Sequence, residues 1–203
     1  MLNKNLNDDT SIIKELIFEE WKPNVFYIDI KDYARTVEDA FINGKEGIYI
    51  SNGEGVHAYV GDKVFDYDLA KELNVLPVEL NYVGGTILGS CKDLSIIIVF
   101  PRIMDVDHEF IISNITNIIS KYVPNTTYNG NDILVDDKKV SGSMMRQNEV
   151  STIWAAQISF EDYSKYIAKL CYKPPIKKPS YIDSNLITRD DLEHEILNWL
   201  RKE

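Results

Sequence analysis

The stretch at residues 130–143, GNDILVDDKKVSGS, carries the most information about the structure and chemistry of this chain of 203 residues. Short strand patterns at 133–135 and 140–143 flank the polar turn at 136–138, and this spacing predicts a β-hairpin. Lys139 begins the returning strand, where it would be a fixed positive charge beside small residues. Such a charge suits a bound carboxylate or phosphate. An exposed hairpin with solvated lysines is the alternative interpretation.

Small and polar residues surround this lysine. Asn131 and Asp132 stand where a loop would enter the first strand, so they can present two polar side chains to a ligand. Ser141 and Gly142 follow the lysine, and small residues in a strand allow close approach of a ligand to the backbone. Neither Ser141 nor Ser143 has an evident histidine partner, which argues against a serine–histidine hydrolase.

Hydrophobic periodicity predicts helices that alternate with strands along the rest of the chain. The run LSIIIVF at 94–100 predicts a strand buried on both faces, and NGEG at 52–55 predicts a hairpin between its flanking strands. The pattern favours an α+β fold with a mixed or antiparallel sheet flanked by helices. Helices are predicted at 11–21, 33–42, 66–73, 106–122, 161–171 and 188–200, and strands at 24–30, 47–51, 56–60, 76–81, 94–100, 133–135, 140–143 and 151–160.

The C-terminal part differs in composition. KPPIKKPS at 173–180 is rich in proline and lysine and predicts an extended strap. An amphipathic helix follows, with Thr188 as its N-cap. We therefore expect a main domain at 1–175, with the strap and helix at 176–203 packed on the same domain.

Bulk properties exclude several classes of function. A net charge of −10 argues against broad nucleic-acid binding, although a locally positive pocket can still bind a nucleotide. The polar N-terminus predicts no signal peptide, and no apolar run is long enough to cross a bilayer. Two distant cysteines and three scattered histidines predict neither a disulfide nor a structural zinc site. We expect a cytoplasmic protein.

The run at 130–143 resembles the lysine motif of the lipoate- and biotin-protein ligases. In that motif a small residue, Asn-Asp, an apolar strand, an acidic turn and a lysine precede a step of small residues, and Asn131, Asp132, Lys139, Ser141 and Gly142 match it in order. The resemblance implies a class II synthetase-like fold. It also implies that Lys139 contacts the acyl carboxylate and the α-phosphate of an acyl-adenylate, with Asn131 and Asp132 near the phosphates and their Mg²⁺.

A second segment, LPVELNYVGGTILGSCKDLSII at 76–97, resembles the glycine-rich loop of the same family. Gly84, Gly85 and Thr86 match its core, which in the family wraps the acyl chain and the adenylate. Glycine is needed where a Cβ would block the approach of the backbone to a ligand. The resemblance covers residues 33–170, and Glu38 falls on a family glutamate, although a solvated helix face also explains it.

The chain departs from the family where arginines usually precede the glycine loop, because Glu79 and Leu80 stand there. Losing an arginine removes a bidentate, permanently charged clamp for phosphate. Three alternatives follow: a ligase with a rearranged nucleotide site, an ATP-independent transferase that takes its acyl group from a carrier, and a degenerate member that binds only a ligand or partner. Cys91 is a candidate nucleophile, or else a small buried residue.

The resemblance implies a ligase that adenylates lipoate, octanoate or biotin with ATP and Mg²⁺, then transfers the acyl group to a lysine of a lipoyl or biotinyl carrier domain. Lys139 is the expected catalytic residue, and Asp132 is also the expected metal ligand. The small acid, ATP and the carrier domain are the expected partners, without nucleic acid or membrane. The residues expected to bind substrate or nucleotide are Gly84, Gly85, Thr86, Asn131, Asp132, Ser141 and Gly142.

Overall fold

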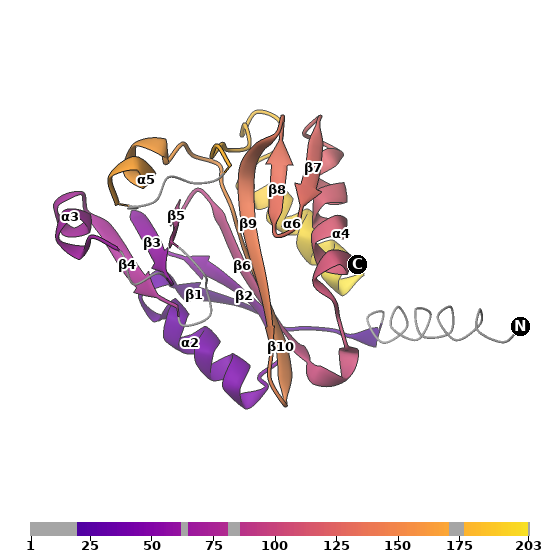
Figure 1. Cartoon of the computed structure of the whole chain (residues 1–203). Helices are drawn as coiled ribbons and strands as arrows, with labels where there is room; N and C mark the ends of the chain where they lie inside the picture. The colour runs from indigo at the N-terminus through magenta and orange to yellow at the C-terminus, as the bar shows by residue number, and fades with distance from the viewer. Residues whose placement is uncertain (1–19, 62–64, 81–85, 171–176, 203) are drawn as a thin grey trace, which may run out of the picture.

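The computed structural model describes residues 20–61, 65–80, 86–170 and 177–202, which form two β-sheets with helices on their faces (Figure 1). The strands are β1 (Val25–Asp29), β2 (Gly47–Asn52), β3 (Val56–Val60), β4 (Val75–Glu79), β5 (Thr86–Ser90), β6 (Leu94–Pro101), β7 (Thr126–Asn129), β8 (Asp132–Val135), β9 (Lys138–Gln147) and β10 (Ser151–Ile158). The helices are α2 (Ile30–Asn43), α3 (Tyr67–Glu72), α4 (His108–Ser120), α5 (Ser164–Leu170) and α6 (Arg189–Arg201), with a 3-10 turn at Arg102–Met104.

The larger sheet has seven strands in the order β1-β2-β6-β10-β9-β8-β7. β1 and β2 are parallel, and the other neighbours are antiparallel, so the predicted α+β fold with a mixed sheet is confirmed. The central strands are buried on both faces, as predicted for the LSIIIVF run in β6. The smaller sheet has the order β4-β3-β5 and contains one parallel pair.

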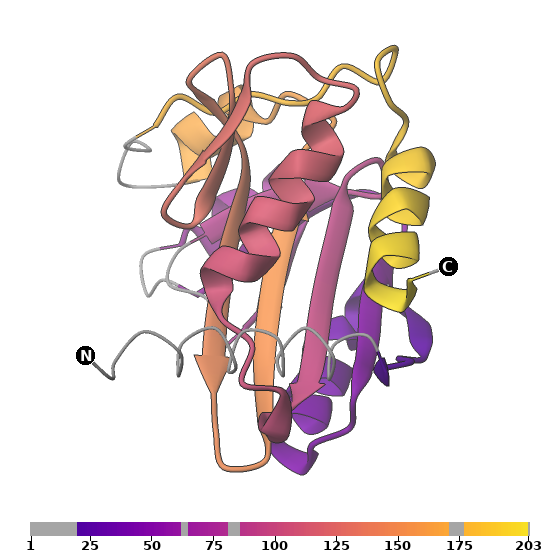
Figure 2. The same ribbon diagram turned by 90° about the vertical axis from the view of Figure 1, so that its right-hand side faces the viewer.

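Each face of the large sheet has its own hydrophobic core. Helices α4 and α6 cover one face (Figure 2). The hydrophobic core there contains Ile111, Ile115 and Ile196 of the helices, Ile96 and Ile98 of β6, and Trp154 of β10. Helix α2 and the small sheet cover the other face. The side of the small sheet that includes Ala58 packs against α3 and α5. The space between the two sheets is therefore enclosed by strands from both.

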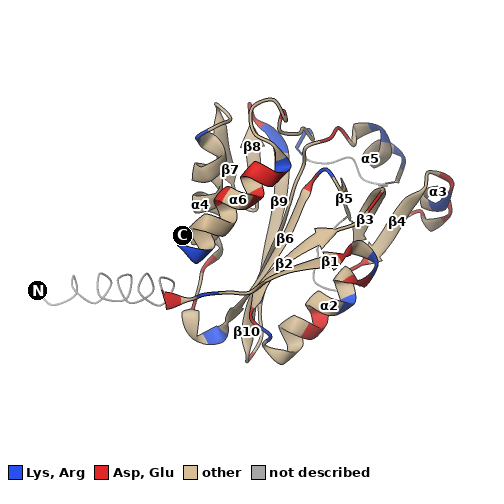
Figure 3. Ribbon diagram, turned by 180° about the vertical axis from the view of Figure 1, so that it is seen from behind, with Lys and Arg blue, Asp and Glu red and all other residues tan. Residues whose placement is uncertain are grey.

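The helix ends follow from local sequence. The N-caps of α3, α4 and α6 are Asp66, Asp107 and Thr188. Their side chains accept hydrogen bonds from backbone N–H groups of the first turn. The Thr188 cap was predicted. Helix α2 ends at Gly44, whose φ of 63° is the left-handed conformation that glycine adopts without strain. Both acidic and basic residues occur on α2 and α6, as Figure 3 shows.

The predicted hairpin around residues 52–55 is wrong, although both of its strands exist. β2 pairs with β1 and β6 in the large sheet, whereas β3 pairs with β4 and β5 in the small one. The segment therefore carries the chain from one sheet to the other. Gly53 in this segment has a packing role, because a Cβ on Gly53 would lie 2.6 Å from Cγ2 of Ile30. An Asn-Gly pair marks a change of direction but does not specify which strand pairs next.

The hairpin predicted at 133–143 is confirmed. β8 and β9 pair antiparallel across a turn in which Asp136 and Asp137 both have positive φ, as a two-residue hairpin turn requires. The strap runs beside β9: the Lys139 N–H donates to Lys178 O at 2.9 Å, and the Ser180 N–H donates to Lys139 O at 2.7 Å.

Some predicted elements fall outside the described residues. The helix expected at 11–21 is described only at its last two residues, and the strap only from residue 177. Helix α6 joins the same hydrophobic core as α4. Within the described ranges, no helix combines the length and the apolar character needed to cross a membrane.

Candidate functional site

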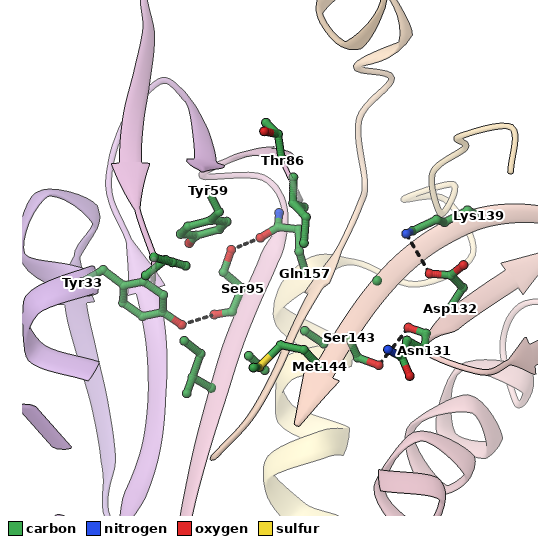
Figure 4. A pocket seen from close by; sticks show the side chains of 16 residues that line it. Tyr33, Tyr59, Thr86, Ser95, Asn131, Asp132, Lys139, Ser143, Met144 and Gln157 are labelled. Atoms are coloured by element: carbon green, nitrogen blue, oxygen red, sulfur yellow. Dashed lines mark hydrogen bonds and ion pairs between the residues drawn. The ribbon is translucent and has the colours of Figure 1, made fainter. Parts of the chain in front are cut away.

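A cavity of about 310 Å³ lies between the two sheets. That volume lies at the lower end of the range for small-molecule sites. Polar side chains stand at opposite sides of it, and apolar ones lie between (Figure 4). The lining residues are Tyr33, Tyr59, Leu80, Thr86, Ile87, Ser95, Ile97, Asn131, Asp132, Lys139, Gly142, Ser143, Met144, Ala155, Ala156 and Gln157.

One side of the cavity is charged. The Lys139 ammonium lies 2.7 Å from Oδ1 of Asp132, and the Lys177 ammonium lies 2.9 Å from Oδ2 of the same carboxylate. Lys177 also donates to the carbonyl of Asn129 at 3.2 Å. The three ionised side chains are partly shielded, with exposures of 36% for Lys139, 27% for Lys177 and 20% for Asp132. Together they carry one net positive charge, which suits an anion.

A β-bulge directs Lys139 into the cavity. Ile133 pairs with Ser141 while Leu134 pairs with Lys139, so Val140 has no partner in β8. In a regular strand Lys139 and Gly142 would face opposite sides, but the extra residue places both on the cavity wall. A Cβ on Gly142 would lie 2.9 Å from Nζ of Lys139, so this glycine leaves room for the ammonium. We expected a ligand to approach the backbone closely at these small residues, but in the structure the Lys139 ammonium makes the close approach to Gly142.

The environment of Asp132 keeps it ionised. Burial raises the pKa of Asp132, the hydrogen bonds from Lys139 and Lys177 lower it, and the net pKa lies below its ordinary value. Both carboxylate oxygens already have ammonium partners. No group of three or more His, Cys, Asp or Glu that could hold a metal occurs in the part of the chain that the structure describes. These residues do not fit a Mg²⁺ site at Asp132 in this arrangement.

The opposite side of the cavity is polar but uncharged. Tyr33 donates to the carbonyl of Tyr49 at 3.1 Å, and the Ser95 hydroxyl donates to Oε1 of Gln157. Tyr59 lies beside these groups, and burial raises its pKa to about 12, so its hydroxyl stays protonated at neutral pH. This side offers hydrogen bonds without a formal charge.

Glu79 is the last residue of β4, and Leu80 follows it directly with its side chain in a different environment. Leu80 is only 4% exposed and lines the cavity. Glu79 instead accepts a hydrogen bond from the Tyr67 hydroxyl at 3.0 Å on the exposed side. The glutamate therefore does not repel an anion in the cavity, and the wall at this point is apolar.

Ser143 has a histidine partner, contrary to expectation. Its Oγ lies 2.9 Å from Nε2 of His108 at the start of α4. The same hydroxyl donates to the carbonyl of Asn131 at 2.9 Å, so its proton is already directed away from the histidine. The arrangement ties the loop before β8 to β9 and α4. The sequence could not show it, because His108 lies far from Ser143 along the chain.

The structure brings together most of the predicted site residues. Thr86, Asn131, Asp132, Lys139 and Gly142 all line the cavity. Ser141 does not: it is 2% exposed, between β8 and β10, and outside the lining.

Other sequence candidates have different positions. Gly84 and Gly85 lie outside the described residues. Cys91 is an exposed free thiol outside the lining, so its interpretation as a small buried residue is wrong. The Lys92 ammonium beside it pairs with Glu161 at 2.6 Å.

Sequence reasoning missed Lys177 and Gln157. The lysine-rich composition of the strap was a signal for Lys177, but nothing local connected it with Asp132. A lone glutamine in an apolar strand was the available signal for Gln157.

No family model and no curated protein matches this chain, but solved structures match its fold. P. falciparum LipL1 in complex with lipoate has a TM-score of 0.74 at 15% identity, covering 89% of this chain and 62% of that one. A lipoate-protein ligase A bound with ATP has a TM-score of 0.62 at 14% identity, covering 87% and 83%. A mutant biotin protein ligase from Aquifex aeolicus with biotin has a TM-score of 0.54 at 11% identity, covering 88% and 69%.

These matches define the architecture. The fold is that of the catalytic domains of lipoate- and biotin-protein ligases, so the predicted class II synthetase-like fold is confirmed. This chain spans less than two thirds of the length of LipL1. At identities of 11% to 15%, the TM-scores show a shared fold alone, and function must be argued from the site.

Proposed function

We propose that this chain binds a small carboxylic acid in the cavity, adenylates it with ATP and passes the acyl group to a lysine of a carrier domain. Lipoate, octanoate and biotin are the candidate acids, and a lipoyl or biotinyl domain is the candidate carrier. The observation that carries the proposal is the position of Lys139. Its ammonium stands at one side of a largely apolar cavity, beside Gly142, in a fold shared with ligases that bind lipoate, ATP or biotin.

The proposed chemistry balances without a covalent enzyme intermediate. A carboxylate oxygen of the acid attacks the α-phosphorus of ATP and displaces pyrophosphate. The carrier amine then attacks the acyl carbon of the mixed anhydride, loses a proton and releases AMP. Lys139 would hold the carboxylate and offset the negative charge that develops at the α-phosphate. Thr86 and Gly142 would form the adjoining wall, and Asn131 would face the phosphates.

Asp132 has a different part in this proposal. It holds Lys139 in the absence of ligand, and an incoming carboxylate would take its place. Asp132 would keep Lys177 as its partner, so no half-buried charge would be left uncompensated.

The wall at Leu80 favours a second candidate function. A leucine there supplies no charge for a nucleotide phosphate, and the described lining contains one cation, Lys139. The same cavity would serve a transferase that takes its acyl group from a carrier without ATP, or a protein that binds the acid without turnover.

Calorimetric titration separates these functions. Lipoate, octanoate and biotin are each titrated with ATP and Mg²⁺, and AMP is measured in parallel. Saturable binding with AMP formation, lost in Lys139→Ala and retained in Lys138→Ala, is the expected result. Lys138 is the exposed neighbour at the turn and serves as the matched control. Binding without AMP would favour the second candidate, and no binding of any acid would exclude both.

A further inference from the structure

The described part of the strap, residues 177–180, is bound to the residue that carries the proposed chemistry. The N–H of Lys139 donates to Lys178 O at 2.9 Å, and the Ser180 N–H donates to Lys139 O at 2.7 Å. Lys139 also forms a parallel β-bridge with Pro179. The strap therefore satisfies both backbone hydrogen-bonding groups of Lys139.

The strap takes over this edge of β9 where β10 ends. The last residue of β10, Ile158, pairs with Ser141 of β9. Beyond this pair, Val140 O accepts from the Ser159 N–H at 2.8 Å, and the backbone of Lys139 bonds to the strap. Val140 is also the extra residue of the bulge with β8. The backbone next to Lys139 is therefore irregular towards β8, and the strap supplies its regular partner on the other edge.

Two contacts fix the strap itself. At its described start, the Lys177 ammonium lies 2.9 Å from Oδ2 of Asp132 and donates to the carbonyl of Asn129 at 3.2 Å. Just after the strap, Ile182 is 1% exposed in the hydrophobic core that contains α4 and α6, and its N–H donates to Ser159 O at 2.8 Å. The strap is thus held by the charged side of the cavity at one end and by the core at the other.

Small displacements of Lys139 would have large effects. Its ammonium stands at the end of a flexible four-carbon side chain, so a rotation of the backbone at the bulge would move the ammonium further than it moves the Cα. A functional group must be held within about 0.5 Å of its productive position, and a misplacement of about 1 Å can lower a rate about hundredfold. Lys139 therefore needs a fixed backbone.

We propose that the strap positions Lys139, with the carbonyl of Lys178 and the N–H of Ser180 as the groups that fix its backbone. The inference rests on the proposed function, in which Lys139 meets the carboxylate of the acid. Lys177 acts on the same ammonium through Asp132, which lies against Lys139 in Figure 4. The strap is therefore part of the site, and its residues act through Lys139 rather than by contact with the acid.

A double-mutant cycle separates positioning from a purely structural role. Ser180→Pro removes the N–H that holds Lys139, and proline is compatible with an extended strap. Calorimetry measures the affinity for lipoate, octanoate and biotin in the wild-type and the Lys139→Ala backgrounds. Ser180→Pro should weaken binding about tenfold when Lys139 is present and leave the residual affinity unchanged when Lys139 is replaced. A strap that only stabilised the fold would lower stability without this dependence on Lys139.

Tyr181→Pro is the matched control. Tyr181 is the next residue along the chain and is exposed, and its N–H bonds to no backbone carbonyl among the described residues. This variant should bind the acid as the wild type does. Pro179→Gly is the second variant if Ser180→Pro does not fold, because it keeps every hydrogen-bonding group of the strap and only frees the backbone. It should weaken binding severalfold, with the same dependence on Lys139.

The outcomes distinguish this inference from the proposed function. Wild-type affinity in both folded strap variants would overturn the inference while leaving acid binding intact. An effect that is equal in both backgrounds, or that Tyr181→Pro reproduces, would also overturn it. An effect that depends on Lys139, without AMP formation, would support the inference and count against adenylation. Acid binding that is absent, or that does not depend on Lys139, would overturn the inference and the proposed function together.

Discussion

The two polar sides of the cavity differ in how their groups are partnered. On the charged side, Asp132 bridges two lysines at 2.7 and 2.9 Å, and the three side chains are 20% to 36% exposed. On the neutral side, Gln157 is 3% exposed, and His57, which lies near it but outside the cavity lining, is 4% exposed; each has a nitrogen without a partner among the described residues. The charged side pairs its charges with one another, whereas on the neutral side two buried nitrogens have no hydrogen-bond partner among the described residues.

This difference has a physical basis. Long lysine side chains that reach solvent can exchange one anion for another at modest cost, because water compensates the charges during the exchange. Groups enclosed between two sheets cannot rearrange in this way, since close-packed interiors resist displacement. We therefore expect substitutions on the charged side to change binding and substitutions on the neutral side to change stability and selectivity.

The largest expected effect is the loss of the Lys139 ammonium. Lys139→Ala should weaken binding of the acid about hundredfold, because a positioned charge in a shielded site is lost. Its free energy of unfolding should change little, since Asp132 retains Lys177. Calorimetry and chemical denaturation measure the two quantities. A variant that loses stability but binds normally would contradict this division of roles.

The pH dependence of stability should report the neutral side. Burial depresses the pKa of His57 to about 4 in the folded state from its ordinary value of 6.5, so the unfolded chain takes up a proton first as the pH falls. The stabilisation is complete above pH 6.5 and is lost between that pH and 4. Between neutral pH and pH 5 the loss should be about 2 kcal/mol.

Denaturation of His57→Gln at both pH values checks this prediction. The variant should lack this part of the pH dependence. His194→Gln, at an exposed position on α6, should retain it. If the free energy of unfolding changed equally with pH in the wild type and in both variants, His57 would not be buried as described.

Adding one methyl group on each side sharpens the comparison. Gly89→Ala places a Cβ 2.3 Å from a buried amide and 2.9 Å from a buried ring, and such overpacking should cost about 1–3 kcal/mol. Gly142→Ala meets the flexible end of Lys139 at 2.9 Å, so it should cost below about 1 kcal/mol but weaken acid binding. Equal losses of stability in the two variants would contradict the expected difference, in which the Lys139 side chain moves to accept the methyl group and the buried side chains beside Gly89 cannot.

The smallest expected effect belongs to Lys177. Lys177→Ala should raise the pKa of Asp132 towards its ordinary value of 3.8, because one of its two ammonium partners is lost. The stabilisation from this carboxylate is present above that pH and is lost as the pH falls further. Acid binding should weaken severalfold, since release of Lys139 would leave Asp132 unpaired.

Carbon-detected NMR titration of the Asp132 carboxyl and calorimetry measure both effects. Lys178→Ala is the control, because its exposed side chain has no ion pair with Asp132 and its backbone carbonyl still binds Lys139. An unchanged Asp132 pKa in Lys177→Ala would show that the strap lysine is not part of the site.

Local patterns predicted much of the secondary structure and one side of the site. Alternation and turn chemistry were sufficient to predict the β8–β9 hairpin and Lys139 within it. The continuous apolar run predicted that β6 is buried on both faces. These features depend on residues within about ten positions of one another, so the physical causes are visible in the sequence.

Strand pairing and the neutral side could not be predicted in the same way. A glycine turn at 52–55 is compatible with a hairpin or with a crossing between sheets, and burial of β2 between β1 and β6 made the difference. Gln157 became a site residue only because β5 and β3 lie against β10 with a glycine at the contact. The bulge at Val140 likewise depends on the register with β8.

Residue order alone specified the helix caps, the strand periods, the hairpin turn and the lysine on its returning strand, because these rest on short-range sterics and hydrogen bonds. Folding in three dimensions was needed to place Lys177 on Asp132, Ser143 on His108 and Gln157 opposite Lys139. These pairs are far apart in sequence. They meet because burial of two apolar faces brings the sheets, the helices and the strap together, and no local propensity encodes such contacts.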